Sequence, residues 1–310
     1  SKRWRAALET VMITMVFRLI QERLMRCLAL GIVILLLQAP ASFAGDWTGT
    51  LKRIDDSGEM NIGYREAEPP MSFVNDSGKP VGYSVDLCGH ILAAVKQTLG
   101  REDIEARYVP VSAEDRFDAI ETGKIDILCG ATTKTLSRSE RVTFTQLTFV
   151  TGASLLSLEA TKVPTVAELK DKKVAVVSGT TTIEAIRRAL KNMLISADVV
   201  PVPSAAEGMA MLDSGEVDAF SSDQVVLIGQ VLSRDSGKRY SLSEELFSFE
   251  PFALALARGD ADFKLVADRA LSQLNRSGQI GMIYDTWFGR FAQEPPLVLK
   301  ALYQLNATPE

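Results

Sequence analysis

The sequence is poor in the residues on which metal sites and many catalytic sites depend. It contains one histidine and three cysteines among 310 residues. The histidine, His90, has no cysteine at metal-ligand spacing. Because His90 is the single histidine, we also identify no Ser or Cys nucleophile with a histidine as its base. We therefore expect no metal, no cofactor and no catalytic residues. We interpret His90 as a solvated or helix-packing side chain.

The apolar run near the front of the chain is too short to span a bilayer. It reads CLALGIVILLL, Cys27 to Leu37, and has eleven residues, whereas a spanning helix needs about 20. Eleven residues fit the apolar core of a secretory signal peptide, which has about 7 to 15. Arg23 and Arg26 supply the preceding basic charge. The segment therefore predicts export, with an uncleaved anchor as the alternative.

Small residues follow this run at the spacing of a cleavage site. Ser42 and Ala44 take the two small positions, so we place the cut before Gly45. Residues 1–44 are then a leader, and Met25 is the expected start of translation because the segment before it is unusually long. We expect the mature protein in the periplasm.

Basic residues are outnumbered, with 34 Lys and Arg against 39 Asp and Glu and a net charge of −5. Removal of residues 1–44 takes away six basic side chains and two acidic ones, so the remaining chain is more acidic still. This balance argues against nucleic acid or an anionic membrane surface as a partner. Any anionic ligand must be held by local arginines.

The remaining composition, 46% hydrophobic and 24% charged, is that of a globular protein with a substantial core. Without the leader, Cys88 and Cys129 are the only cysteines. A secreted chain with two cysteines tends to pair them. The sequence therefore predicts a disulfide between Cys88 and Cys129.

One pattern occurs twice in the chain. The short apolar strands MNIGY (60–64) and KVAVVS (173–178) are each followed by a helical pattern. Further on, RFDAIETGKIDIL (116–128) and GMAMLDSGEVDAF (208–220) share a layout of helix, C-capping glycine (Gly123 or Gly215), acidic residue three positions later and strand. The repeat predicts two α/β lobes of related topology with parallel sheets.

Polar residues follow the predicted strands, at the edge where ligands bind in parallel sheets. They are Arg65, Ala131 to Thr133 in CGATTKTLSR, Ser178 to Thr182, and Asp223. One lobe supplies the first two groups and the other lobe supplies the last two. The sequence therefore predicts a ligand site in a cleft between the lobes. For CGATTKTLSR alone, a turn with a helix cap is the alternative interpretation.

The types of these residues indicate an α-amino acid. The stretch SGTTT opens a helix, so the amides and hydroxyls of Thr180 and Thr181 can hold an anion. Arg138 can add a bidentate contact to a carboxylate. Asp223 can accept from an ammonium group, although a helix N-cap or a solvated turn explains it equally well.

Two arginines remain for a second carboxylate on the ligand. Arg65 lies at a strand end, and Arg116 opens a helix, where a cation opposes the helix dipole. A residue placed against its local preference is often functional. The alternative is that Arg116 pairs on the surface with a neighbouring acid, Glu114, Asp115 or Asp118.

From about Glu59 to Phe291 the chain resembles the periplasmic solute-binding proteins of polar amino acid ABC transporters, most closely the glutamate/aspartate-binding branch. The resemblance rests on GYREAEPPMSFVNDSGKPVGYSVDL, VSAEDRFDAIETGKIDILCGATTKTLSR, VAVVSGTTT, SGEVDAFSSD and SGQIGMIYDTWFGRF. It covers nearly the whole chain after the leader.

The resemblance implies a role for each candidate residue. Arg138, Thr133 and Thr181 match positions that take the α-carboxylate, and Asp223 matches the position that takes the α-ammonium. Thr132 and Thr180, beside these threonines, are also expected to bind the ligand. Arg65 and Arg116 match the pair that binds a side-chain carboxylate. The implied partners are glutamate or aspartate and a membrane ABC permease, for a protein that acts as a monomer.

The chain departs from the family pattern at three positions. Ala131 replaces a serine that helps to hold the ammonium, Ala113 replaces a serine near the side-chain end, and Ala205 replaces a histidine there. Each change removes a hydrogen bond worth about 0.5 to 1.5 kcal/mol. These departures bear on the choice of ligand more than on its class.

The resemblance also implies the fold, an α/β, two-lobed periplasmic-binding-protein fold of type II with two hinge strands. The crossings are expected near FVTGAS (149–154) and FEPFAL (249–254). Lobe one would be residues 45–150 and 252–310, and lobe two residues 151–251. Such lobes close on a ligand by a population shift.

Two other functions remain open. A periplasmic dehydratase acting on a cyclohexadienyl amino acid precursor shares this fold, and would need a positioned acid such as Glu66, Glu68 or Asp86 in the cleft. A sensory module would need a membrane span or a signalling domain after the second lobe.

Overall fold

The computed structural model describes residues 47–234, 239–291 and 294–310, so the predicted leader lies outside the described residues. Within those residues, no helix is both long and apolar enough to cross a membrane. The elements in chain order are α2 Gly49–Ser57, β1 Glu59–Tyr64, β2 Ala67–Glu68, β3 Ser72–Val74, β4 Pro80–Val81, α3 Tyr83–Leu99, β5 Glu105–Pro110, α4 Arg116–Glu121, β6 Ile127–Cys129, α5 Leu136–Ser139, β7 Val142–Thr151, β8 Ala153–Leu158, η1 Glu159–Thr161, η2 Val166–Leu169, β9 Lys173–Val177, α6 Thr181–Met193, β10 Asp198–Val202, α7 Ala205–Ser214, β11 Ala219–Asp223, α8 Gln224–Leu232, β12 Tyr240–Leu242, β13 Glu250–Ala257, α9 Ala261–Ser277, α10 Gln279–Phe288 and α11 Leu297–Leu305.

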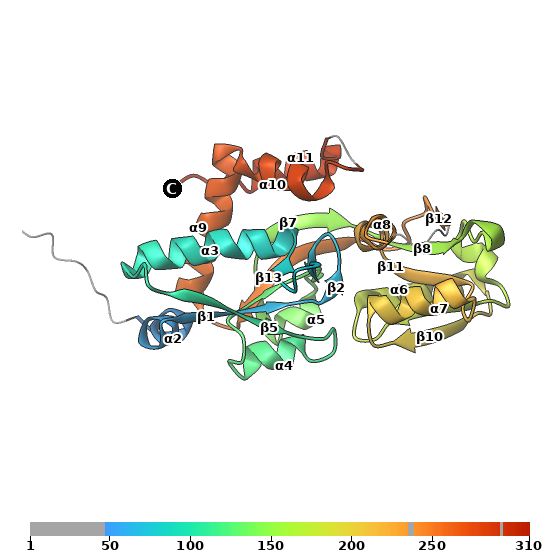
Figure 1. The fold of residues 1–310 in the computed structure, drawn as a ribbon, viewed down its shortest axis with the longest axis horizontal. Coiled ribbons are helices and arrows are strands. Elements are labelled where there is room, and N and C mark those ends of the chain that lie inside the picture. The colour runs from blue at the N-terminus through green and yellow to red at the C-terminus, as the bar shows by residue number, and fades with distance from the viewer. Residues whose placement is uncertain (1–46, 235–238, 292–293) are drawn as a thin grey trace, which may run out of the picture. The chain divides into compact units, whose positions relative to one another are not determined.

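Two sheets organise these elements (Figure 1). The first has the strand order β5-β1-β6-β13-β7, and the second has the order β10-β9-β11-β8-β12. We call each sheet with its covering helices a lobe. The chain enters the second sheet between Thr151 and Ala153 and returns to the first between Leu242 and Glu250.

Both sheets are mixed, where the sequence pattern predicted parallel sheets. The strands β5, β1 and β6 are parallel, as are β10, β9 and β11. The strands β13 and β7 in the first sheet, and β8 and β12 in the second, pair antiparallel to their neighbours. Both passages of the chain between the lobes join strands of this antiparallel set, β7 to β8 and β12 to β13.

The second lobe shows why its strands and helices pack as they do. In β9, alternate residues face opposite sides of the sheet. Val174 and Val176 pack with Ile186 of α6, while Ala175 and Val177 pack with α7 and α8 through Met209, Leu212 and Leu227. The apolar faces of these helices therefore cover both sides of one strand.

In the first lobe, α4 covers one face of the sheet. Phe117 and Ile120 of α4 pack on Leu128 of β6 and on Ala253 and Ala255 of β13. On the other face, α3 packs against β6 and α9, and α9 packs against β7. Figure 1 shows α3 and α4 on opposite sides of the strands. The sheet is thus covered on both faces, and its strand ends are left for the site.

The repeat seen in the sequence is also found in the hydrogen bonds of the two lobes. Asp126 and Asp218, the acidic residues three positions after the glycines, take equivalent places in the two lobes. Asp126 Oδ2 accepts from Asn61 N at 2.7 Å, and Asp218 Oδ2 accepts from Lys173 N at 2.8 Å. Each aspartate thereby fixes the start of the first parallel strand of its lobe. The glycines differ slightly, because Gly215 is the C-cap of α7 while Gly123 follows the C-cap Thr122 of α4.

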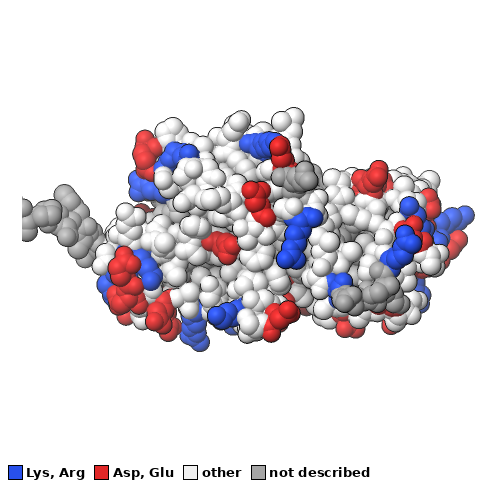
Figure 2. Space-filling model, turned by 45° about the horizontal axis from the view of Figure 1, so that its top comes forward, with Lys and Arg blue, Asp and Glu red and all other residues white. Residues whose placement is uncertain are grey.

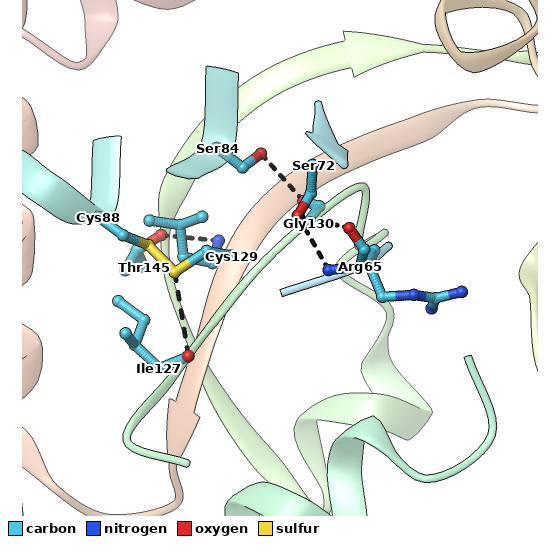
Figure 3. The surroundings of a disulfide bond; sticks show 9 residues. Arg65, Ser72, Ser84, Cys88, Ile127, Cys129, Gly130 and Thr145 are labelled. Carbon is cyan, nitrogen blue, oxygen red and sulfur yellow. Dashed lines mark hydrogen bonds between the residues drawn. A yellow bond between two sulfur atoms is a disulfide. The ribbon is translucent and has the colours of Figure 1, made fainter. Parts of the chain in front are cut away.

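The predicted disulfide joins Cys88 of α3 to Cys129 at the end of β6 (Figure 3). It lies directly before the loop that carries the candidate threonines. Ser84 of α3 also donates to the carbonyl of Gly130 at 3.1 Å. The disulfide and this hydrogen bond hold the end of β6 against α3, which places the following loop.

On the face shown in Figure 2, the basic and acidic side chains of the described residues are interspersed in small groups. The candidate arginines differ from such surface charges because they are inside the protein. Arg65 is 6% exposed and Arg116 is 2% exposed. A buried arginine needs a compensating anion or several acceptors, so we next consider what surrounds them.

Candidate ligand-binding site

The predicted site residues lie at the carboxyl ends of strands in both lobes. Arg65 follows β1, Thr132 and Thr133 follow β6, and Thr180 and Thr181 follow β9 at the start of α6. Asp223 is the last residue of β11. The parallel strands of each lobe therefore bring these side chains to one edge.

Hydrogen bonds join the two groups across the lobes. The guanidinium of Arg116 donates to the carbonyl of Gly179 at 3.0 Å, and that of Arg138 donates to the same carbonyl at 3.3 Å. The hydroxyl oxygens of Thr133 and Thr181 are 3.3 Å apart. Residues about 50 positions apart in the sequence are thus brought together at one place.

The sequence did not point to Glu250, which lies at the centre of this arrangement. It begins β13 and is 2% exposed. Its Oε2 accepts from the hydroxyls of Thr133 at 2.6 Å and Thr181 at 2.7 Å, and its Oε1 accepts from Ser248 at 2.6 Å. The only signal in the sequence was an acidic residue within the apolar crossing segment FEPFAL.

Glu250 restricts what the two threonines can offer a ligand. A hydroxyl has one proton, and in this arrangement Thr133 and Thr181 give theirs to Glu250. A ligand carboxylate would have to compete with Glu250 for these protons, whereas a ligand ammonium could use the free lone pairs. Thr180 is also engaged, because its hydroxyl donates to the carbonyl of Val177 at 2.7 Å.

Burial perturbs the charged groups of the site. Burial, reinforced by Arg138 and Arg65, lowers the pKa of Arg116 to about 9. Burial also lowers the pKa of Arg138, against the opposing effect of Glu250 and Asp223. Arginine side chains remain protonated in proteins. An added anion would stabilise these charges.

Asp223 shows the opposite shift. Burial, followed by the nearby Glu250 and Glu68, raises the pKa of Asp223 well above its usual value, although Arg138 and Arg116 oppose this. Its Oδ1 is buried and has no hydrogen-bond partner among the described residues. Asp223 occupies the N-cap position of α8 but makes no side-chain cap hydrogen bond. The capping interpretation is therefore wrong.

The surroundings of Arg116 also decide between the two sequence interpretations. Its guanidinium does not pair with Glu114, Asp115 or Asp118, and its Nε is a buried donor without a partner in the described part of the chain. The surface ion pair is therefore wrong. For CGATTKTLSR, the helix-cap interpretation is correct for Thr135, which caps α5 by accepting from Arg138 N at 3.1 Å.

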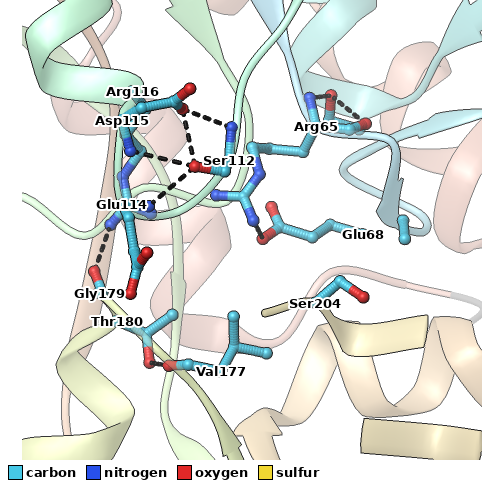
Figure 4. Close-up of polar contacts among 12 residues, drawn as sticks. Arg65, Glu68, Ser112, Glu114, Asp115, Arg116, Val177, Gly179, Thr180 and Ser204 are labelled. Carbon is cyan, nitrogen blue, oxygen red and sulfur yellow. Dashed lines mark hydrogen bonds and ion pairs between the residues drawn. The ribbon is translucent and has the colours of Figure 1, made fainter. Parts of the chain in front are cut away.

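Arg65 pairs with Glu68, an acid that the sequence indicated only as a candidate catalytic residue of a dehydratase. Its guanidinium lies 3.1 Å from Oε1 of Glu68. Figure 4 shows the Glu68 carboxylate beside the Arg65 guanidinium, with Arg116 on the other side of Ser112. A cavity of about 340 Å³ adjoins this pair, and we call it the side-chain cavity. Its lining includes Arg65, Glu68, Ser112, Ser204 and Ala205.

Neither of the other two candidate acids has a buried carboxylate free to act in the site. Asp86 accepts from the indole N–H of Trp287 at 2.6 Å, and the side chain of Glu66 is exposed. His90 is exposed on α3, as the solvated interpretation predicted. Among the described residues, no three His, Cys, Asp or Glu side chains are grouped so that they could hold a metal ion.

With the fold and site described, comparison with known proteins identifies the family. Residues 60–290 match the bacterial extracellular solute-binding proteins, family 3. The chain belongs to this family. A protein of Pseudomonas aeruginosa named L-glutamate/L-aspartate-binding protein is 33% identical over 262 residues, which cover 84% of this chain and 86% of that protein. A protein of Escherichia coli named glutamate/aspartate import solute-binding protein is 28% identical over 257 residues, covering 83% of this chain and 84% of that protein.

Solved structures of other binding proteins have the same fold. An ancestral arginine-binding protein bound to arginine matches with a TM-score of 0.67 and 26% identity, covering 75% of this chain and 99% of its own. A cysteine-binding protein from Campylobacter jejuni matches with a TM-score of 0.71 and 23% identity, covering 81% of this chain and 98% of its own. The predicted two-lobed, type II periplasmic-binding-protein fold is therefore confirmed, and this solute-binding protein is a component of an ABC transporter.

Proposed function

We propose that this solute-binding protein holds an acidic α-amino acid, glutamate or aspartate, between its lobes in the periplasm and delivers it to the membrane permease of its ABC transporter. The names of the relatives from Pseudomonas aeruginosa and Escherichia coli support the acidic ligand. A resemblance in sequence does not by itself fix a ligand, so the chemistry of the site carries the rest of the argument.

One observation carries the amino acid assignment. Asp223 Oδ1 is a buried acceptor and Arg116 Nε is a buried donor, and neither has a hydrogen-bond partner among the described residues. Leaving a buried polar atom unpaired costs about 1 to 3 kcal/mol. A ligand that carries both an ammonium group and a carboxylate would satisfy both atoms at once.

Each candidate residue then has a role in the proposal. The α-carboxylate is held by Arg138 with Thr132–Thr133 and Thr180–Thr181, and to bind these threonines it displaces the hydrogen bonds that their hydroxyls make to Glu250 and to the carbonyl of Val177. The ammonium is held by Asp223. The side-chain carboxyl extends toward Arg65 and Arg116, beside the side-chain cavity. Ala205 lines that cavity and leaves room in it.

The proposal includes the division of the chain. Residues 1–44 are a cleaved leader, residues 45–150 and 252–310 form lobe one, and residues 151–251 form lobe two. The mature protein acts as a monomer whose lobes close on the ligand. Contacts from both lobes to one ligand would bias the equilibrium toward the closed state.

A dehydratase is the less favoured function. Of the acids that such an enzyme could use, Glu66 is exposed and Asp86 is bonded to Trp287. Glu68 lies at the site but is ion-paired with Arg65. The named relatives are binding and import proteins, and we propose that this chain is likewise not an enzyme.

Calorimetric titration of the protein with glutamate, aspartate, alanine and norvaline would test the proposal. The wild type should bind the acids more tightly than the two apolar amino acids. Replacement of Arg65 or Arg116 by Ala removes a charged hydrogen-bond donor, worth about 1.5 to 3 kcal/mol or roughly ten- to 150-fold in affinity. That loss should fall on the acids and spare norvaline.

Variants at the residues that bind the α-carboxylate and the ammonium group give the matched comparison with Arg65→Ala and Arg116→Ala. Arg138→Ala and Asp223→Asn should weaken all four amino acids by similar factors, because all share the α-carboxylate and the ammonium. Equal losses for norvaline and glutamate in Arg65→Ala and Arg116→Ala would contradict the acidic ligand. Binding of none of the four would contradict an amino acid ligand altogether.

A further inference from the structure

Glu68 places a hydrogen-bond acceptor, its carboxylate, next to the arginines that are proposed to bind the side chain of the ligand. Its Oε1 is bonded to Arg65, but its Oε2 is a buried acceptor without a hydrogen-bond partner in the described part of the chain. Gly130 allows this placement, because a Cβ there would lie 2.9 Å from Cγ of Arg65 and 3.7 Å from Oε2 of Glu68. The Glu68 side chain thus lies beside Arg65 in the lining of the side-chain cavity.

The unpaired atoms at this end are a donor and an acceptor. Arg116 Nε can donate, and Glu68 Oε2 can accept. A ligand carboxylate only accepts, so it would satisfy Arg116 and leave Glu68 Oε2 unpaired. A carboxamide has a carbonyl oxygen that accepts and an NH2 group that donates, so it could satisfy both atoms.

We propose that Glu68 is a specificity-determining residue, and that its free oxygen makes the site accept amino acids with a carboxamide side chain as well as those with a carboxylate. The inference rests on the proposed binding of an α-amino acid, and it widens the class of side chains. The carbonyl oxygen of the amide binds toward Arg65 and Arg116, and its NH2 group donates to Glu68.

The charges around Glu68 support a weakened preference for acids. The charged groups near it are Arg65 from the end of β1, Arg116 from α4 and Asp223 from β11. The neighbouring Glu66 also lines the side-chain cavity, while the α7 side contributes the uncharged Ser204 and Ala205. An ionised carboxylate bound at Arg65 would lie near the negative charge of Glu68, whereas an amide would not be repelled.

The site as a whole matches three cations with three acidic side chains. The cations are Arg65, Arg116 and Arg138, and the acids are Glu68, Asp223 and Glu250, of which Asp223 is ionised most readily when an ammonium group binds it. An acidic amino acid adds one net negative charge to this set, and a carboxamide amino acid adds none. Uncompensated charge in a buried site is costly, so the balance favours amides more than a site without Glu68 would.

Calorimetric titration of the protein and of two variants tests the role of Glu68. The ligands are the matched pairs glutamate and glutamine, and aspartate and asparagine. In Glu68→Gln, the acids lose a like charge and gain a possible donor, while the amides lose a charged acceptor. Each effect is about tenfold, and the two act on the ratio in the same direction, so the acid-to-amide affinity ratio should rise by about a hundredfold. Glu216→Gln is the matched control, because it removes the same charge from an exposed side chain that does not line the side-chain cavity, and it should leave the ratio unchanged.

The acid-to-amide affinity ratio shows whether Glu68 determines specificity or has only a structural role. If Glu68 only stabilises Arg65, Glu68→Gln would weaken both members of each pair equally, and the proposal would be overturned. Should the variant fail to fold, wild-type binding of glutamine decides, because a wild type that binds glutamate but not glutamine contradicts the proposal. Amino acid binding with an unchanged ratio refutes the inference alone, whereas binding of none of the four refutes the proposed function and the inference with it.

Discussion

Gly229 offers the sharpest test of how the lobes meet. It lies within α8 of the second lobe and faces the backbone of Pro69 in the first lobe. A Cβ at this position would be 2.0 Å from the carbonyl oxygen of Pro69 and 2.7 Å from Cδ of Pro70. Next to it, Gln230 donates to the carbonyl of Ala67 at 2.7 Å. Only glycine lets the helix approach this closely.

Gly229→Ala should therefore oppose closure without harming the lobe that carries it. The neighbouring atoms are backbone, so they cannot move aside as a flexible side chain would, and the lobes must separate by more than about 1 Å at this contact. Overpacking of this kind costs about 1 to 3 kcal/mol, or roughly five- to 150-fold in ligand affinity. Within α8 alone, Ala is better than Gly by about 0.8 to 1 kcal/mol.

The assay is calorimetric titration of both the wild type and Gly229→Ala with each amino acid ligand, with the melting temperature measured in the absence of ligand. We expect weaker binding of every ligand and an unchanged or higher melting temperature. Gly89→Ala is the matched control, because Gly89 lies within α3 and has nothing within 4 Å of the added Cβ. It should raise the melting temperature and leave affinity unchanged. Wild-type affinity in Gly229→Ala would refute the reasoning.

Three further predictions follow from buried groups. Glu250→Gln should lower stability by about 1 to 3 kcal/mol in denaturant unfolding, because a neutral amide cannot accept all three hydroxyl protons as a carboxylate does. Unchanged stability would show that these three hydrogen bonds do not stabilise the fold. The raised pKa of Asp223 means that the folded state holds its proton more tightly, so this group's contribution to stability is complete below the unfolded pKa and is lost as pH rises through the folded one. Asp223→Asn should thus raise the melting temperature of the ligand-free protein at neutral pH while weakening amino acid binding, and a lower melting temperature would contradict the burial argument. Joint replacement of Cys88 and Cys129 by Ala should lower the free energy of unfolding by about 3 to 4 kcal/mol, from loop-closure entropy alone, and a loss below 1 kcal/mol would count against that account.

The sequence by itself determined the elements and the edge at which the site lies. The spacing of Ile183, Ile186 and Leu190 specifies the buried face of α6. The pattern of glycine, aspartate and strand specifies the start of β1 and β9 through Asp126 and Asp218. These features depend on local periodicity and on strand ends, which a linear pattern records.

Tertiary structure decided which charges meet at the site. Glu250 bonds threonines that are 117 and 69 residues away, and this contact exists only because β13 returns from the second lobe beside both of them. Arg65 packs against Gly130, where a Cβ would lie 2.9 Å from its Cγ, and the guanidinium of Arg116 donates to the carbonyl of Gly179 from the other lobe. Such contacts depend on how two lobes and the strands between them are packed, because hydrogen bonds and ion pairs act over a few ångströms in space and take no account of separation along the chain.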